Sequence, residues 1–166
     1  MTVSETIKAA GITPSADYTG VEMADDFLLA IQTEPTQTDV KSWVVCADHV
    51  KSHAAALNAS TADEAYIRTG TASIKTNTQR TFTIEGDRQP GDPFQAFALS
   101  HRIVYGTGQE VVVPYVYFSL RTGKGEKGTV SLIVNADADG AAGEKAAFKI
   151  DMKATARPDE YTYTAD

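Results

Sequence analysis

The sequence contains one cysteine, Cys46, among 166 residues. A single cysteine excludes an internal disulfide framework, so the chain must be held by packing, within itself or against copies of itself. No run of apolar residues approaches the ~20 that a membrane-crossing helix needs. The first twenty residues lack the basic start and the apolar segment of a secretory signal, which predicts an intracellular origin.

Basic charge is also scarce. The chain carries 15 Lys and Arg residues against 22 Asp and Glu residues, for a net charge of −7 and a pI near 4.9. This balance excludes a gross basic patch that could hold nucleic acid through its phosphates. An acidic surface favours solubility and repels phosphate backbones. Hydrophobic content of 42% and charged content of 22% predict one ordinary globular domain.

Helical periodicity is rare, and alternation typical of strands is common. In "AFKIDMKATARP" the apolar residues Phe148, Ile150, Met152 and Ala154 fall on one face. "TVSLIVN" repeats this pattern, and "DFLLAIQT" and "VKSWVVCA" also read as strands. The threonine-rich stretch "EAYIRTGTASIKTNTQRTFTIEG" predicts strand, loop and strand, with Phe82 and Ile84 facing inward in its second half.

The segment "EVVVPYVYFSL" is apolar on both faces. A strand of this kind needs a second layer or a second subunit to cover it, and Pro114 favours an edge or a bulge. A subunit interface would remove the liability of an exposed apolar edge. The candidates for that interface are Val111, Val113, Tyr115 and Tyr117.

One short helix is predicted over about residues 93–105. Asp92 is a suitable N-cap, Pro93 fits the first turn, and Gln95 completes a capping-box pattern. Gly106 offers a C-terminal stop. The sequence thus predicts a mainly β protein with one flanking helix, and with polar, extended arms at both termini.

The stretch "NADADG" places Asn135, Asp137 and Asp139 at alternate positions before Gly140, as in the start of an EF-hand calcium loop. Position 12 of that loop would be Ala146 instead of a bidentate glutamate, and strands flank the stretch where helices are required. A polar hairpin loop is the favoured interpretation, with calcium as the alternative.

Other candidate sites are weaker still. "CADHVKSH" gathers residue types that bind zinc, without the glutamate of a metalloprotease motif; they are Cys46, Asp48, His49 and His53. "GKGEKG" matches the letters of a dinucleotide fingerprint, but a strand follows it, which favours a basic hairpin tip. No nucleophile motif or acid–base pair stands out, and we predict no catalytic residue and no cofactor.

The order of segments resembles the major tail protein, or tail tube protein, of long-tailed bacteriophages. The resemblance lies in a threonine-rich strand pair, then "EGDRQPGDPFQAF" with its helix start, then paired hairpins ending in "GTVSLIVNADADGAAGEKAAFKIDMKATARPDEYTYT". It covers roughly residues 25–160. It rests on segment order and local patterns.

The resemblance implies a β-sandwich or barrel with one flanking helix. We therefore expect an N-terminal arm over residues 1–20, a tail-tube domain over 21–158 and a C-terminal tail over 159–166. Proteins of this family form hexameric rings that stack into a hollow virion tube, and they have no catalytic residues. The implied partners are further copies, the tape measure protein, and tail-terminator and baseplate proteins. DNA would pass through the lumen without specific binding, and synthesis would occur in the cytoplasm of the host bacterium.

Two other classes of function stay open at this point. The chain could be a β-sandwich module that binds a ligand or receptor, with Tyr105, Tyr115 and Tyr117 as candidates for its contact patch. It could also be a calcium-dependent module that uses "NADADG". A self-assembling structural protein predicts rings or tubes, whereas a binding module predicts a monomer or small oligomer.

Overall fold

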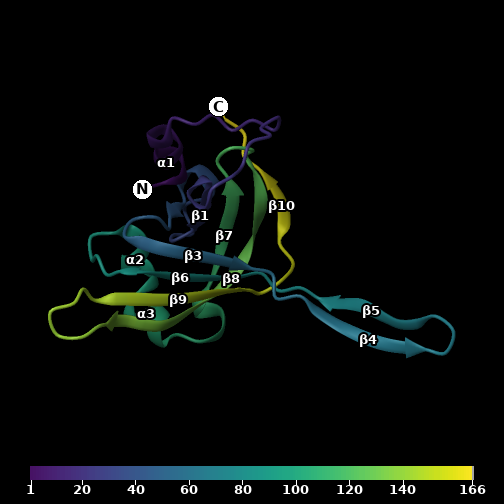
Figure 1. Cartoon of the computed structure of the whole chain (residues 1–166). Coiled ribbons are helices and arrows are strands. Elements are labelled where there is room, and N and C mark those ends of the chain that lie inside the picture. Colours follow the sequence, from purple (N-terminus) through teal and green to yellow (C-terminus); the bar gives the residue numbers. More distant parts are fainter. Residues whose placement is uncertain (166) are drawn as a thin grey trace.

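Antiparallel strands in the order β2-β1-β7-β8-β9-β6-β3, with β10 beside β8, form the body of the molecule (Figure 1). The computed structural model describes residues 1–165. The strands of this sheet are β1 (Phe27–Ile31), β2 (Val44–Val45), β3 (Val50–Ala56), β6 (Thr81–Asp87), β7 (Val112–Ser119), β8 (Lys124–Asp139), β9 (Ala147–Ala154) and β10 (Asp159–Thr162). A separate hairpin consists of β4 (Ser60–Tyr66) and β5 (Gly70–Asn77).

The sheet curls because the long strand β8 changes partners along its length. Its first half pairs with β7 and β10, and its second half pairs with β9. The strand β7 therefore runs across the direction of β3, β6 and β9 (Figure 1). Register shifts after Val134 and Ala136 show that the far end of β8 is irregular, as expected where a strand bends.

The larger core fills the inside of this curl. The predicted inward residues of β9 are buried, and so are Phe82 and Ile84 of β6, as their alternation predicted. The core continues into the helices α2 (Pro93–Ala98) and α3 (His101–Tyr105) through Phe94, Ala98 and Ile103. Burial of several large side chains at about 1.5–3 kcal/mol each is the main force that closes the sheet over these helices.

A second core lies on the other side of β7. Val116 and Phe118 of this strand, and Leu120 just after it, pack there with β1, with the 3-10 turn at Val40–Ser42 and with Trp43. Helix α1 (Val3–Ala10) covers this core with the fully buried Val3. Both faces of β7 are thus buried in one chain, and the required second layer comes from the chain itself.

The N-terminal residues form a helix where an extended arm was expected. The Thr2 side chain accepts a hydrogen bond from the Glu5 backbone, and the Glu5 side chain accepts one from the Thr2 backbone. Gly11 ends the helix in the left-handed conformation. Residues 159–162 are likewise ordered, because they form β10, which pairs with β8. Within the described residues, no helix is long and apolar enough to cross a membrane.

The predicted helix at 93–105 is two short helices. The Asp92 cap is confirmed, since its carboxylate accepts a hydrogen bond from the Gln95 amide. The chain becomes extended at Ser100, the N-cap of α3, and Ile103 is the buried residue of α3. The Gln95 side chain does not close a capping box; it donates to Asp87 O and accepts from Gln89 N.

We expect Asp92→Asn to stabilise the protein near pH 7. Burial raises the pKa of Asp92, and one of its carboxylate oxygens has no hydrogen-bond partner. Asparagine also caps helices well but carries no charge, so the gain is about 1 kcal/mol, or about 2–4 °C in Tm.

This gain should depend on pH in one direction. Because the folded-state pKa is raised, acidification neutralises Asp92 in the folded protein first, so the charge costs less as pH falls. The difference in Tm between wild type and variant should vanish below about pH 3.9, the ordinary pKa of Asp. Thermal melts across this range check it, and a constant difference would contradict it.

Candidate assembly surfaces

Most of the large exposed hydrophobic side chains of the described chain gather in two places. Leu57, Tyr66, Ile67 and Ile74 belong to the β4–β5 hairpin and its root, and Ile67 is fully exposed. Val21 and Met23, which are 84% and 65% exposed, lie together just before β1. Contiguous exposed apolar residues mark interaction surfaces more often than scattered ones do.

The β4–β5 hairpin projects away from the body (Figure 1). Within residues 1–165 its two strands pair only with each other, and all their residues are exposed except the half-buried Ala62. The seven residues of β4 span roughly 23 Å, whereas a chain of this length has a radius of gyration of about 15 Å. The tip therefore reaches far beyond the chain's own core.

A hairpin of this kind is not stable by its own contacts. Isolated two-stranded hairpins are marginal in water, and this one has no apolar face packed against the body. Its internal support includes a hydrogen bond from Ser73 to Asp63 and one from Thr76 to the Ser60 carbonyl. The arrangement fits an element that is completed by a partner.

A mostly buried ion pair lies at the root of the hairpin. The Arg80 guanidinium contacts the Glu126 carboxylate through Nε at 2.5 Å and Nη2 at 3.3 Å, and the Tyr115 hydroxyl donates to the same carboxylate at 3.0 Å. The side chains of Arg80 and Glu126 are 15% and 20% exposed. Burial, followed by the Glu126 charge, raises the pKa of Tyr115 well above its usual range. This cluster ties the start of β6 to β7 and β8.

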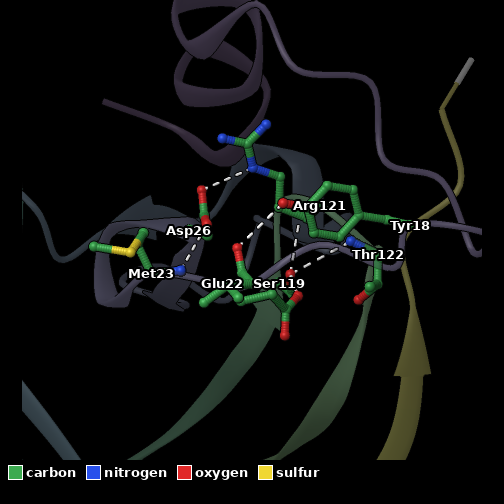
Figure 2. Close-up of polar contacts among 8 residues, drawn as sticks. Tyr18, Glu22, Met23, Asp26, Ser119, Arg121 and Thr122 are labelled. Atoms are coloured by element: carbon green, nitrogen blue, oxygen red, sulfur yellow. Dashed lines mark hydrogen bonds and ion pairs between the residues drawn. The ribbon is translucent and has the colours of Figure 1, made fainter.

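The second surface is the segment of residues 18–26, which ends in a 3-10 turn at Ala24–Asp26 and which we call the strap. Figure 2 shows Asp26 between Met23 and Arg121: its carboxylate accepts from the Met23 amide at 2.8 Å and from Arg121 Nε at 3.0 Å. Ser119 donates to Glu22. The strap is therefore anchored to the turn after β7 by its acidic side chains.

The two exposed apolar side chains of the strap are held by this anchorage. The Tyr18 hydroxyl donates to the Val21 carbonyl at 3.2 Å, and the Arg121 guanidinium lies over the Tyr18 ring at 5.6 Å. Val21 and Met23 thus stand at fixed positions on the surface. A fixed apolar surface loses little conformational entropy when a partner binds.

We expect Asp26→Ala to loosen the strap. The Met23 hydrogen bond, followed by Arg121, lowers the pKa of Asp26, so its charged form is favoured in the folded protein. Loss of both contacts should speed hydrogen exchange at the Met23 amide about tenfold or more, because that amide loses its acceptor. In wild type, the protection of this amide relative to its intrinsic exchange rate should fall as pH falls through the lowered pKa of Asp26. Equal exchange rates in variant and wild type would show that Asp26 does not hold the strap.

The structure places the interface candidates, Val111 just before β7 and the others on β7, inside the single chain. Val111, Val113 and Tyr115 are at most 8% exposed and belong to the larger core. Tyr117 is half-buried and packs against Phe27 and Phe82. These side chains leave little free surface for a neighbour, because β6 and the helices already cover them. Pro114 of β7 precedes Tyr115, whose partner Ile31 is the last residue of β1. No residue of β1 therefore lies opposite the proline, and its missing N–H costs little there.

The residues of the calcium alternative lie on a strand. Asn135, Asp137 and Asp139 belong to β8, and the turn that follows spans residues 140–146, so the predicted loop begins later than expected. Asn135 donates to Asp151 at 2.6 Å, and Asp137 lies 3.6 Å from Arg88. Within residues 1–165, no three His, Cys, Asp or Glu side chains are grouped to hold a metal ion.

The remaining sequence candidates also take structural positions. Cys46 is a buried free thiol in the larger core, and burial raises its pKa well above the ordinary value. His49 and His53 lie before and on β3, so they share no helical face. "GKGEKG" is mostly the start of β8, and the hairpin tip is at residues 120–123 instead. Tyr105 is 74% exposed but Tyr115 is buried, so the three candidate tyrosines form no common patch.

Sequence reasoning named neither the projection of the hairpin nor the strap. The stretch from Glu64 to Gly86 was predicted as strand, loop and strand with Phe82 and Ile84 in its second half, whereas it contains the end of β4, all of β5 and most of β6. The lack of an alternating apolar face in β4 and β5 was the available signal of strands without a core. The strap spans the expected boundary at residue 20, and the sequence analysis assigned no role to its acidic and apolar residues. Its anchor, Arg121, is 95 residues from Asp26 in sequence, which no local pattern indicates.

Comparison with solved structures identifies the architecture. One similar chain occurs in the tail of an empty gene transfer agent (GTA) particle determined with helical refinement and C6 symmetry. It has a TM-score of 0.62 and 14% identity, and the match covers 86% of this chain and 100% of the other. A chain in the virion of a native GTA particle matches with a TM-score of 0.60, 13% identity and the same coverage.

Sequence-level comparison gives no further relatives. No family model matches the chain, and no curated protein matches it. The likeness is therefore one of fold, over nearly the whole chain. This chain shares the fold of a chain in the tail of one GTA particle and of a chain in the virion of another.

Proposed function

We propose that this chain is a tail tube subunit, whose copies form hexameric rings that stack into a hollow tube for DNA delivery. The observation that carries the proposal is the fold shared over 86% of the chain with a subunit of a GTA tail that has C6 symmetry. The role is structural and uses no catalytic residue. The proposed location is the virion tail, after synthesis in the cytoplasm of the host bacterium.

The β4–β5 hairpin supports self-assembly on physical grounds. It reaches beyond the body, exposes both faces and carries apolar side chains at its tip. An element that is marginal alone becomes stable when a neighbouring copy covers it. Repeated head-to-tail contacts between different surfaces of identical chains produce closed rings or open filaments, which are the forms that a tube requires.

The charge of the chain is compatible with a tube for DNA. At a net charge of −7, a repeating assembly is strongly acidic. Proteins hold DNA by releasing counterions through Lys and Arg contacts, and an acidic lumen makes few of them. DNA would then pass without specific binding. The tape measure protein would occupy the same lumen before ejection, and tail-terminator and baseplate proteins would end the tube.

Light scattering over a concentration series tests self-assembly. We expect the mass to rise from 17.8 kDa toward multiples of six chains as concentration increases. A mass that stays at one chain at every concentration, including at the highest soluble concentration, would reject the proposal for the protein acting alone. A stable mass of six chains that never grows would support rings but reject their stacking.

A further inference from the structure

We propose that the hairpin tip of one copy docks on the strap of the next copy. This inference rests on the proposed function, because it names the two surfaces that join the subunits. The tip consists of residues 66–70 and the strap of residues 18–26. Each surface carries two exposed apolar side chains and unpaired charge, and the charges have opposite sign.

The apolar halves of the contact are similar in size and exposure. At the tip, Ile67 is fully exposed and Tyr66 is 51% exposed. On the strap, Val21 and Met23 are 84% and 65% exposed. Removal of apolar surface from water is the main driving force of association, and each pair offers a compact patch for it. A thioether side chain such as that of Met23 adapts well to an aromatic ring such as that of Tyr66.

The charged halves are complementary. The tip carries Arg68 and no acid between Tyr66 and Gly70. The strap carries Glu22, Asp25 and Asp26 and no Lys or Arg. Asp26 is already paired with Arg121, whereas Asp25 and Arg68 are exposed and have no ion-pair partner within residues 1–165. Opposite charges at the rim of an apolar contact set its orientation and speed its formation.

The two surfaces of one chain do not face each other. The hairpin projects to one side, far from β1, the strand that directly follows the strap (Figure 1). The contact must therefore join two copies. It is heterologous, since tip and strap are different surfaces, so every copy can give one tip and receive another. The anchored strap supplies a fixed receiver, and the hairpin gains the partner that its strands lack.

The decisive experiment mixes two defective variants. Ile67→Ser disables the tip and leaves the strap intact, and Met23→Ser does the reverse. Both positions are exposed, so the monomers should melt as wild type does. Each variant alone should associate about tenfold to a hundredfold more weakly than wild type, from the loss of one buried apolar side chain. An equimolar mixture should form 1:1 dimers, because one good junction per pair remains.

The outcomes separate this inference from the proposed function. Dimers in the mixture and monomers of each variant alone support the docking of tip on strap. Variants that assemble as wild type does, or a mixture that stays monomeric, overturn it while leaving wild-type rings and tubes in place. A wild type that never assembles overturns the proposed function and the inference together.

A charge exchange gives an independent reading of the same contact. Arg68→Asp and Asp25→Arg should each weaken association about threefold, as expected for an exposed ion pair, and the double variant should recover most of that loss. The matched control replaces the exposed Arg102 of α3 by Asp in the Asp25→Arg background, which should recover nothing. Equal recovery in the control would show a general charge effect and overturn the specific pairing.

Discussion

Removal of the β4–β5 hairpin is expected to leave a folded monomer that does not assemble. The change replaces residues 58–79 by Asn-Gly, so that these two residues alone connect Leu57 to Arg80. Ala56 of β3 already pairs with Thr81 of β6, so the new turn would begin one residue beyond that pair. Asn-Gly is the preferred two-residue turn between antiparallel strands. Neither β4 nor β5 contributes a side chain to either core, so the Tm should stay within a few degrees of wild type.

The effect on assembly should be complete, because the deletion removes the tip and both exposed strands. Light scattering should give one chain at concentrations where wild type forms large species. A shortened chain that still forms rings would show that the hairpin is dispensable and would contradict its role as the joining element. A large fall in Tm would contradict the structural account in a different way, since it would place the hairpin within the folding unit.

Glu126→Ala is expected to cause the largest loss of stability among single substitutions of charged residues. It leaves the mostly buried Arg80 guanidinium without its partner and takes the acceptor away from the Tyr115 hydroxyl. Breaking a buried pair in this way costs about 3–5 kcal/mol, or a fall in Tm of about 10 °C or more. Chemical denaturation and thermal melts measure it directly.

A matched control is available on the same sheet. Glu85 pairs with Lys149 at 2.9 Å, but these side chains are 50% and 47% exposed. Glu85→Ala should therefore cost less than about 1 kcal/mol. The double variant Arg80→Ala with Glu126→Ala should lose less than the sum of the two single losses, since the residues interact. Equal effects of Glu126→Ala and Glu85→Ala would show that the root cluster is not a buried pair.

Alternation predicted strands well wherever one face is buried. The alternate apolar residues of β9 and β6 are buried, as their spacing of two predicted; they are Phe148, Ile150, Met152, Ala154, Phe82 and Ile84. The two-sided apolar pattern of β7 correctly indicated that both faces are covered. It did not say by what, because a second layer and a second subunit impose the same pattern. The structure resolves this choice with the second core, under α1 and Trp43.

Capping residues in the sequence predicted the start of a helix correctly. Asp92 and Pro93 marked the start of α2 correctly, whereas the extended Ser100 was not foreseen, because the helical spacing continues through it. The residues Thr2 and Glu5 carried the same kind of capping signal at the N-terminus. Such a short helix is held by tertiary packing, here by the burial of Val3, which local sequence does not reveal.

The assembly surfaces were the least predictable part of the molecule. A strand that lies on the body and a strand that projects from it have the same backbone preference, and only the missing apolar face of residues 60–77 distinguishes them. The strap is held by Arg121 and Ser119. The fold brings these two residues from far along the chain to Asp26 and Glu22. Contacts of this range follow from the topology and not from local pattern.

Electron microscopy of the purified wild-type protein, concentrated until light scattering shows growth, tests the central claim most directly. The account predicts six-fold rings with a central channel, and tubes of stacked rings at higher concentration. It also predicts that the chain without residues 58–79 gives neither form. Particles without six-fold symmetry, or a protein that stays monomeric in every field, would contradict the account.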